Sequence, residues 1–134
     1  MKKVLLDTSG YSRLLKGDKL VQTEIEASSA IYFSVIVIGE LLAAFKNGAH
    51  EIKNKNILEK FIQRPQVIIV HVTQETADIY ARVVHILKKQ GTPIPINDVW
   101  IAAHVIETGA KLITHDGHFS KIPGLRIWEV SSGN

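Results

Sequence analysis

Short apolar runs that alternate with helix-like segments constrain the fold of this chain more than any other feature. Runs at residues 3–6, 31–33, 67–70 and 111–113 are short and apolar, and a shorter one follows at 125–128. The intervening segments carry helical periodicity or helix-capping residues. Because successive parallel strands need a helical crossover between them, the alternation predicts an α/β fold. We expect a three-layer sandwich with a mostly parallel sheet of roughly five strands.

Capping residues mark the expected helix boundaries. Polar N-caps accept a hydrogen bond from the first turn, and glycine is favoured just beyond the last turn. Residues 18–28 form a weak amphipathic pattern, and a polar helix over 50–63 is expected to stop before Pro65. The expected N-caps are Asp7, Ser34, Thr73 and Asn97, the expected ends lie at Gly48, Gly91 and Gly109, and Ala77, Tyr80, Val84 and Leu87 are expected to form one buried stripe.

Length and composition predict one ordinary globular domain over residues 1–134. The chain has 46% hydrophobic and 22% charged residues, with no linker or repeat between its segments. It contains no cysteine, which excludes disulfides and thiolate chemistry and fits the cytoplasm. The first apolar run ends at Asp7, too early for a secretion signal, and residues 33–45 are too few to span a membrane. The net charge of +3 permits a polyanionic partner, although charge alone favours the simpler explanation of solvated surface lysines.

Glu40 stands inside the mostly apolar stretch 33–45, where an unpaired ionised carboxylate would be costly. Asp7 and Asp116 follow the first and fourth expected strands, and Asp98 falls in the first turn of the helix before the fourth strand. Ligands of open parallel sheets bind beyond the carboxyl ends of the strands. All four acidic residues are therefore expected on the same rim of the sheet.

Each of these residues also has a purely structural explanation. Asp7 fits a helix cap, Asp98 complements a helix dipole, Asp116-Gly117 is a common turn pair, and Glu40 could reach solvent. Four carboxylates on one rim, however, repel one another and need positive charge to ionise. No lysine or arginine lies within three residues of Glu40, Asp98 or Asp116. A hard divalent cation, Mg²⁺ or Mn²⁺, is the expected partner, and it suits phosphodiester hydrolysis.

The ordered set of these segments resembles the PIN-domain ribonucleases, in particular VapC-type toxins of toxin–antitoxin pairs. The resemblance runs nearly end to end and is carried by Leu5-Leu6-Asp7-Thr8-Ser9, Ser34-Val35-Ile36-Val37-Ile38-Gly39-Glu40-Leu41, Asn97-Asp98-Val99-Trp100-Ile101-Ala102-Ala103, Leu112-Ile113-Thr114-His115-Asp116, Phe119 and Ile122-Pro123-Gly124-Leu125.

The resemblance implies a PIN-like fold and an acidic metal site that is also catalytic, formed by Asp7, Glu40, Asp98 and Asp116. It places Ser9 and Thr114 where the family keeps small polar residues that hydrogen-bond at the site, although asparagine is common at the position of Ser9. It further implies a Mg²⁺- or Mn²⁺-dependent endoribonuclease that acts on RNA. The implied partners are a cognate antitoxin protein and a second copy of the chain in a homodimer.

Three basic or titratable residues are candidates for RNA contact: Arg13, Lys16 and His118. Arg13 and Lys16 follow Asp7 within the same expected helix, and His118 adjoins the Asp116 turn.

Hydrolysis assisted by a metal ion needs no side-chain nucleophile and would leave 5′-phosphate ends.

Two rival interpretations have less support in the sequence. A phosphoacceptor receiver domain needs an aspartate after the third strand, where Val70-His71-Val72-Thr73 offers none. A catalytically idle PIN-like module that only binds RNA or an antitoxin is disfavoured because all four acidic positions are present. RNA cleavage that EDTA abolishes would separate the enzyme from the binding module.

Overall fold

A four-stranded parallel sheet forms the centre of the molecule. The computed structural model describes residues 2–129. Strands β1 (Lys3–Leu6), β2 (Ala30–Ser34), β3 (Val67–Val70) and β4 (Lys111–Ile113) lie in the order β3-β2-β1-β4, and all neighbours are parallel. The predicted α/β class with a parallel sheet is confirmed.

The expected fifth strand at 125–128 is reduced to a single parallel bridge between Leu112 and Ile127. Leu112 donates its N–H to the Arg126 carbonyl, and Trp128 donates to the Leu112 carbonyl, both at 2.8 Å. Because β4 itself has only three residues, it offers this segment little length for a longer ladder. Within residues 2–129 the sheet therefore has four strands rather than five.

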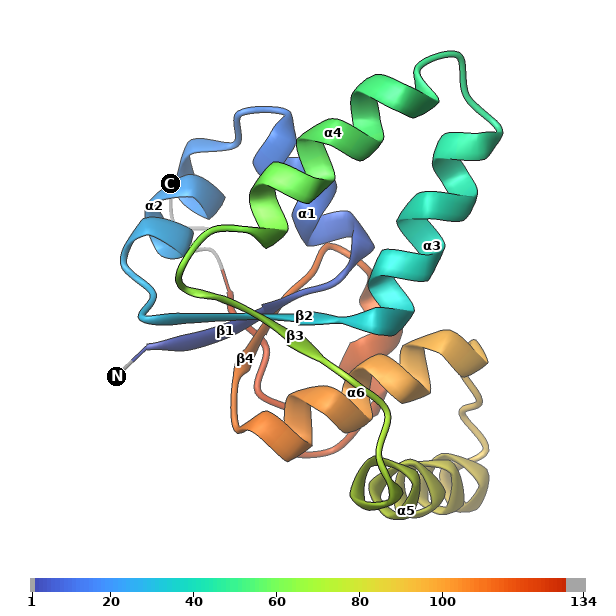
Figure 1. Cartoon of the computed structure of the whole chain (residues 1–134). Coiled ribbons are helices and arrows are strands. Elements are labelled where there is room, and N and C mark those ends of the chain that lie inside the picture. The colour runs from blue at the N-terminus through green and yellow to red at the C-terminus, as the bar shows by residue number, and fades with distance from the viewer. Residues whose placement is uncertain (1, 130–134) are drawn as a thin grey trace.

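Helices cover both faces of the sheet and make the three expected layers (Figure 1). On one side lie α1 (Thr8–Leu15), α2 (Lys19–Glu26), α3 (Val35–Lys46) and α4 (Glu51–Ile62). On the other side lie α5 (Gln74–Gln90) and α6 (Ile96–Thr108), which pack against each other. A short 3₁₀ helix, η1 (Gly117–Lys121), follows β4. Within residues 2–129, no helix combines the length and the apolar character that crossing a bilayer requires.

Local capping chemistry sets most of the helix boundaries. The side chains of Asp7, Ser34 and Thr73 accept hydrogen bonds from the first turns of α1, α3 and α5, as expected. Gly91 and Gly109 adopt the left-handed conformation at the ends of α5 and α6, which an L-residue would adopt only with strain.

Of two expectations about the last long helices, one was wrong and the other was confirmed in part. Asn97 is not an N-cap, because α6 already begins at Ile96 with Pro95 at the cap position. In α5 the buried residues are Thr76, Val83 and Leu87, whereas Ala77 is exposed. Leu87 of the expected stripe is buried, and Tyr80 and Val84 are partly buried and pack against the core, so the stripe holds except at Ala77.

Part of the core lies between the strands and the layer formed by helices α1 to α4. Tyr11, Phe33 and Phe61 form a three-way aromatic cluster with ring centroids 5.4 to 5.5 Å apart. Gly10 lets α1 approach β4 closely, since a Cβ there would lie 2.3 Å from the Ile113 carbonyl oxygen. This close approach places the start of α1 beside the residues that follow β4.

Candidate active site

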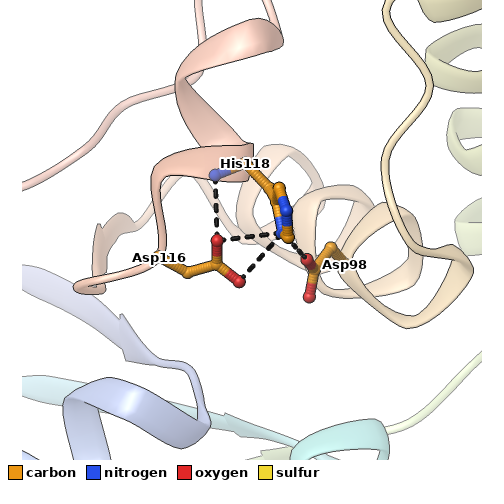
Figure 2. A group of neighbouring side chains, drawn as sticks. All are labelled: Asp98, Asp116 and His118. Carbon is orange, nitrogen blue, oxygen red and sulfur yellow. Dashed lines mark hydrogen bonds and ion pairs between the residues drawn. The ribbon is translucent and has the colours of Figure 1, made fainter.

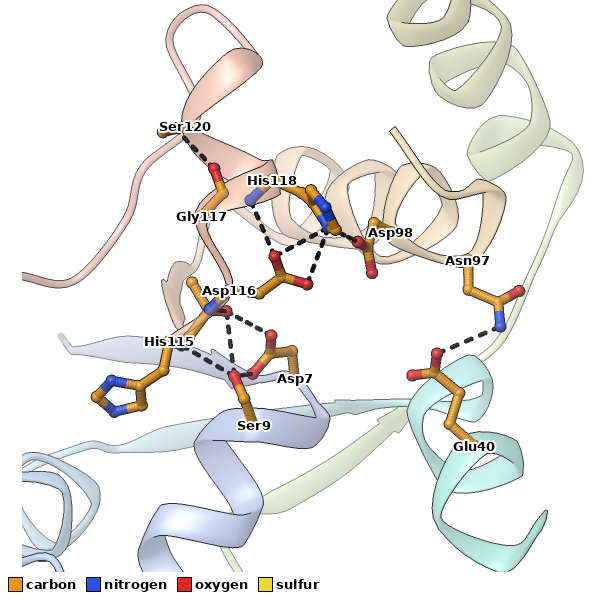
Figure 3. Close-up of polar contacts among 11 residues, drawn as sticks. Asp7, Ser9, Glu40, Asn97, Asp98, His115, Asp116, Gly117, His118 and Ser120 are labelled. Carbon is orange, nitrogen blue, oxygen red and sulfur yellow. Dashed lines mark hydrogen bonds and ion pairs between the residues drawn. The ribbon is translucent and has the colours of Figure 1, made fainter. Parts of the chain in front are cut away.

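Four acidic side chains from separate elements line one cavity of about 250 Å³. Asp7 follows β1 directly, Glu40 comes from the second turn of α3, Asp98 from the first turn of α6, and Asp116 from the loop after β4. Figure 3 shows how the four carboxylates surround a common space. The complete lining is Asp7, Thr8, Ser9, Glu40, Asp98, Ile101 and Asp116.

Asp7 is buried and held by three hydrogen bonds. Its Oδ1 accepts from Ser9 Oγ at 2.8 Å and from the Gly10 backbone N–H at 2.7 Å, and its Oδ2 accepts from Thr114 Oγ1. Burial raises the pKa of Asp7 even though these hydrogen bonds favour the ionised form. The polar residues expected to support the site, Ser9 and Thr114, both contact Asp7.

Asp98 and Asp116 form a second acidic pair. Burial, with the neighbouring charge of Asp116, raises the pKa of Asp98 from 3.8 to about 6, although His118 partly opposes the shift. The η1 backbone fixes Asp116, whose Oδ1 accepts from the His118 N–H at 2.9 Å. The ring of His118 lies between both carboxylates (Figure 2).

Glu40 is half-buried rather than enclosed by the apolar stretch that surrounds it in the sequence. Its Oε1 accepts from Thr8 Oγ1 at 2.7 Å, and its Oε2 accepts from Asn97 Nδ2 at 3.2 Å. These two donors come from α1 and α6, so Glu40 joins the helices on either side of the sheet. Asp7 and Asp98 are more deeply buried than Glu40, although the apolar stretch around Glu40 suggested the reverse.

Positive side chains are scarce around this cavity. Among residues 2–129, no lysine or arginine forms an ion pair with any of the four carboxylates, and the only such pairs are those of His118. The donor set consists of carboxylate oxygens at the carboxyl end of a parallel sheet, and such oxygens suit a hard divalent cation. The residues therefore fit the expected Mg²⁺ or Mn²⁺.

The three candidate RNA-binding residues lie in different places. Arg13 pairs with Asp18 at 3.5 Å, and Lys16 is exposed at the end of α1, about 14 Å along that helix from Asp7. Neither lines the cavity, so their contact with RNA stays a prediction. His118 instead contacts Asp98 and Asp116 at the site itself.

Sequence reasoning missed two residues that orient Glu40, namely Thr8 and Asn97. Both were visible beside the acidic positions, Thr8 directly after Asp7 and Asn97 directly before Asp98. Asn97 was assigned to capping because asparagine is a common N-cap. Its contact with Glu40 depends on the packing of α6 near α3, which local sequence does not report.

Comparison with known proteins identifies the family. Residues 4–125 match the family model described as PIN domain. The chain belongs to the PIN domain family. It is 32% identical over 120 residues to ribonuclease VapC1 of Haemophilus influenzae strain R2866, and the match covers 88% of this chain and 78% of that relative. It is also 32% identical over 135 residues to ribonuclease VapC1 of Rickettsia felis, with 96% and 97% covered.

A solved PIN-domain structure agrees in fold along nearly the whole chain. VapBC-1 from nontypeable Haemophilus influenzae matches with a TM-score of 0.84 and 26% identity, covering 95% of this chain and 97% of that one. The expected resemblance to PIN-domain ribonucleases of the VapC type is confirmed.

Proposed function

We propose that the acidic cavity hydrolyses RNA phosphodiester bonds with a bound Mg²⁺ or Mn²⁺, and that the protein is the toxin of a toxin–antitoxin pair. One observation carries the proposal: carboxylates from four elements line a single cavity of about 250 Å³. A divalent cation bound there would neutralise charge that develops on the phosphate and acidify a water. Asp7, Glu40, Asp98 and Asp116 are the residues that would hold it.

The remaining residues of the site hold these carboxylates in position. Ser9, Thr114 and the Gly10 N–H orient Asp7, while Thr8 and Asn97 orient Glu40. Hydrogen bonds to both oxygens of Asp7 and of Glu40 limit rotation of their carboxylates. A cation would therefore meet largely preorganised ligands, which favours tight binding and reproducible placement of the phosphate.

Cleavage of labelled RNA by the purified protein tests the proposal. We expect cleavage with Mg²⁺ or Mn²⁺, loss of cleavage on adding EDTA, and products with 5′-phosphate ends. Asp7→Asn should abolish cleavage while the protein stays folded. Asp78→Asn is a matched control, since Asp78 is an exposed residue of α5 that pairs with Arg82.

Two results would overturn the assignment of metal-dependent cleavage to this cavity. One is cleavage that persists in EDTA, and the other is undiminished cleavage by Asp7→Asn. RNA binding without any cleavage would instead support the alternative, a catalytically idle PIN module.

The proposed protein partners follow from the relatives. The solved Haemophilus neighbour is a VapBC-1 structure, so a cognate antitoxin is the expected partner of this chain. Expression of the active protein in the cytoplasm should slow growth, and co-expression of that antitoxin should restore it. Growth that is indifferent to high levels of active enzyme would contradict the toxin role.

A homodimer is also proposed, and sedimentation of the purified protein would measure its oligomeric state.

A further inference from the structure

The ring of His118 lies against two of the acidic side chains of the cavity. Its Nδ1 lies 3.1 Å from Asp98 Oδ2 and 2.9 Å from Asp116 Oδ1 (Figure 2). A second oxygen of Asp116 lies 3.2 Å from the same nitrogen. One donor atom from each of these three residues falls within 4.8 Å of the other two. The imidazole thus enters a group of oxygens that the cavity already presents to a cation.

Hydrogen bonding alone satisfies this arrangement poorly. A protonated Nδ1 carries a single hydrogen, yet three carboxylate oxygens on two residues surround it. The same spacing suits ligands of one metal ion, since donors about 2.1 Å from an octahedral cation and at right angles lie about 3 Å apart. The distances between His118 Nδ1 and the two carboxylates match that edge length.

Neighbouring residues of η1 hold the backbone of His118 in place. Asp116 caps η1 and accepts from the His118 N–H at 2.9 Å, which ties the two residues together. Phe119, the next residue, is fully buried and anchors η1 to the core. The side chain of His118 is 46% exposed, so it has room to adjust when a cation enters.

We propose that His118 is a nitrogen ligand of the divalent cation that Asp98 and Asp116 hold, so that the site prefers Mn²⁺ to Mg²⁺. Mg²⁺ selects oxygen ligands and retains its waters, whereas imidazole suits transition metals. The inference rests on the proposed function only in taking the cavity as a cation site. It adds a ligand and a metal preference to the four carboxylates.

Pulsed electron paramagnetic resonance of bound Mn²⁺ tests the inference without relying on activity. Metal-free protein receives one equivalent of Mn²⁺, and the echo modulation is searched for ¹⁴N coupling from a directly bound nitrogen. His118→Asn places an amide near the position of Nδ1, and His118→Ala removes the ligand. His115→Ala is the matched control, because the side chain of His115 points away from the acidic group (Figure 3).

We expect ¹⁴N coupling in the wild type and in His115→Ala, and its loss in both His118 variants. Calorimetric titration should show that His118→Ala weakens Mn²⁺ binding by about tenfold or more, since groups that merely orient metal ligands already contribute that much. Mg²⁺ binding should change by much less, so the preference for Mn²⁺ should shrink.

Coupling that survives in His118→Ala, or Mn²⁺ bound without any nitrogen coupling, would overturn the inference. If RNA cleavage in those experiments still depends on a divalent cation, the proposed function stands although His118 is no ligand. Failure of both Mn²⁺ and Mg²⁺ to bind, together with absent cleavage, would instead remove the proposed function itself.

Discussion

Removal of the Asp98 charge should stabilise the metal-free protein while it abolishes cleavage. Asp98 is 9% exposed, and its pKa is raised from 3.8 to about 6 by burial and by Asp116. At about 1.4 kcal/mol per pKa unit, an ionised Asp98 costs up to about 3 kcal/mol of folding free energy. Partial access of water to the cavity lowers the expected gain of Asp98→Asn to about 1 to 3 kcal/mol.

The gain should depend on pH in a defined direction. Below about pH 4 the carboxyl is neutral in the folded and unfolded states and contributes no difference. Between about pH 4 and about pH 6 the folded protein keeps a proton that the unfolded chain has released, so stability falls as pH rises. Above about pH 6 the full cost of ionisation is present. Asp98→Asn should therefore stabilise at pH 8 and have little effect at pH 4.

Thermal unfolding in EDTA measures this effect. A gain of about 1 to 3 kcal/mol corresponds to a rise in Tm of about 4 to 12 °C for a chain of this size. Mg²⁺ should then raise the Tm of the wild type more than that of the variant, because only the wild type retains the complete ligand set. Asp78→Asn, with a side chain 74% exposed, should shift Tm little at either pH.

Two outcomes would refute this reasoning. A variant that is less stable than the wild type at pH 8 in EDTA would show that ionisation of Asp98 does not lower the free energy of unfolding. An equal gain at pH 4 and pH 8 would show that the effect comes from packing rather than from charge.

Three further substitutions test the supports of the site and of the core. Gly10→Ala should lower stability to urea by about 2 to 3 kcal/mol, because the new Cβ would lie 2.3 Å from the Ile113 carbonyl oxygen; a loss below about 0.5 kcal/mol would contradict the close approach. Tyr11→Phe should leave stability unchanged or raise it by about 1 kcal/mol, since its buried hydroxyl has no hydrogen-bond partner among residues 2–129; a clear loss in the same urea assay would reveal a partner. Asn97→Ala should leave the far-ultraviolet circular dichroism unchanged and raise the Mg²⁺ concentration for half-maximal cleavage by about tenfold, because Glu40 loses an orienting donor; an unchanged Mg²⁺ requirement would exclude that role.

The order of the elements was predictable because it follows from local patterns. The apolar runs became β1 to β4, and Asp7, Ser34 and Thr73 capped their helices as expected. Capping and strand formation depend on neighbours a few residues away, which the sequence shows directly. The expectation that Asn97 is an N-cap is wrong because α6 begins one residue earlier, at Ile96, and the Asn97 side chain instead donates to Glu40, a residue distant in sequence.

The sequence by itself determined which residue types the cavity can use and at which end of the sheet they lie. Asp7 and Asp116 follow expected strands, Glu40 lies early in an expected helix and Asp98 in the first turn of another, and the structure places all four on one cavity. Strand order and helix placement make this possible, because parallel strands bring successive ends to the same edge.

Only the tertiary structure decided which hydrogen bonds hold the carboxylates and how burial shifts their pKa values. Thr114 follows β4 and Asp7 follows β1, so their contact depends on the register in which these two strands pair. It also depends on the close approach of α1 to β4 at Gly10. The burial that raises the pKa values of Asp7 and Asp98, the half-exposure of Glu40 and the place of His118 between two carboxylates have the same origin. Desolvation and long-range hydrogen bonds depend on distances between packed elements, and these distances exist only in the folded chain.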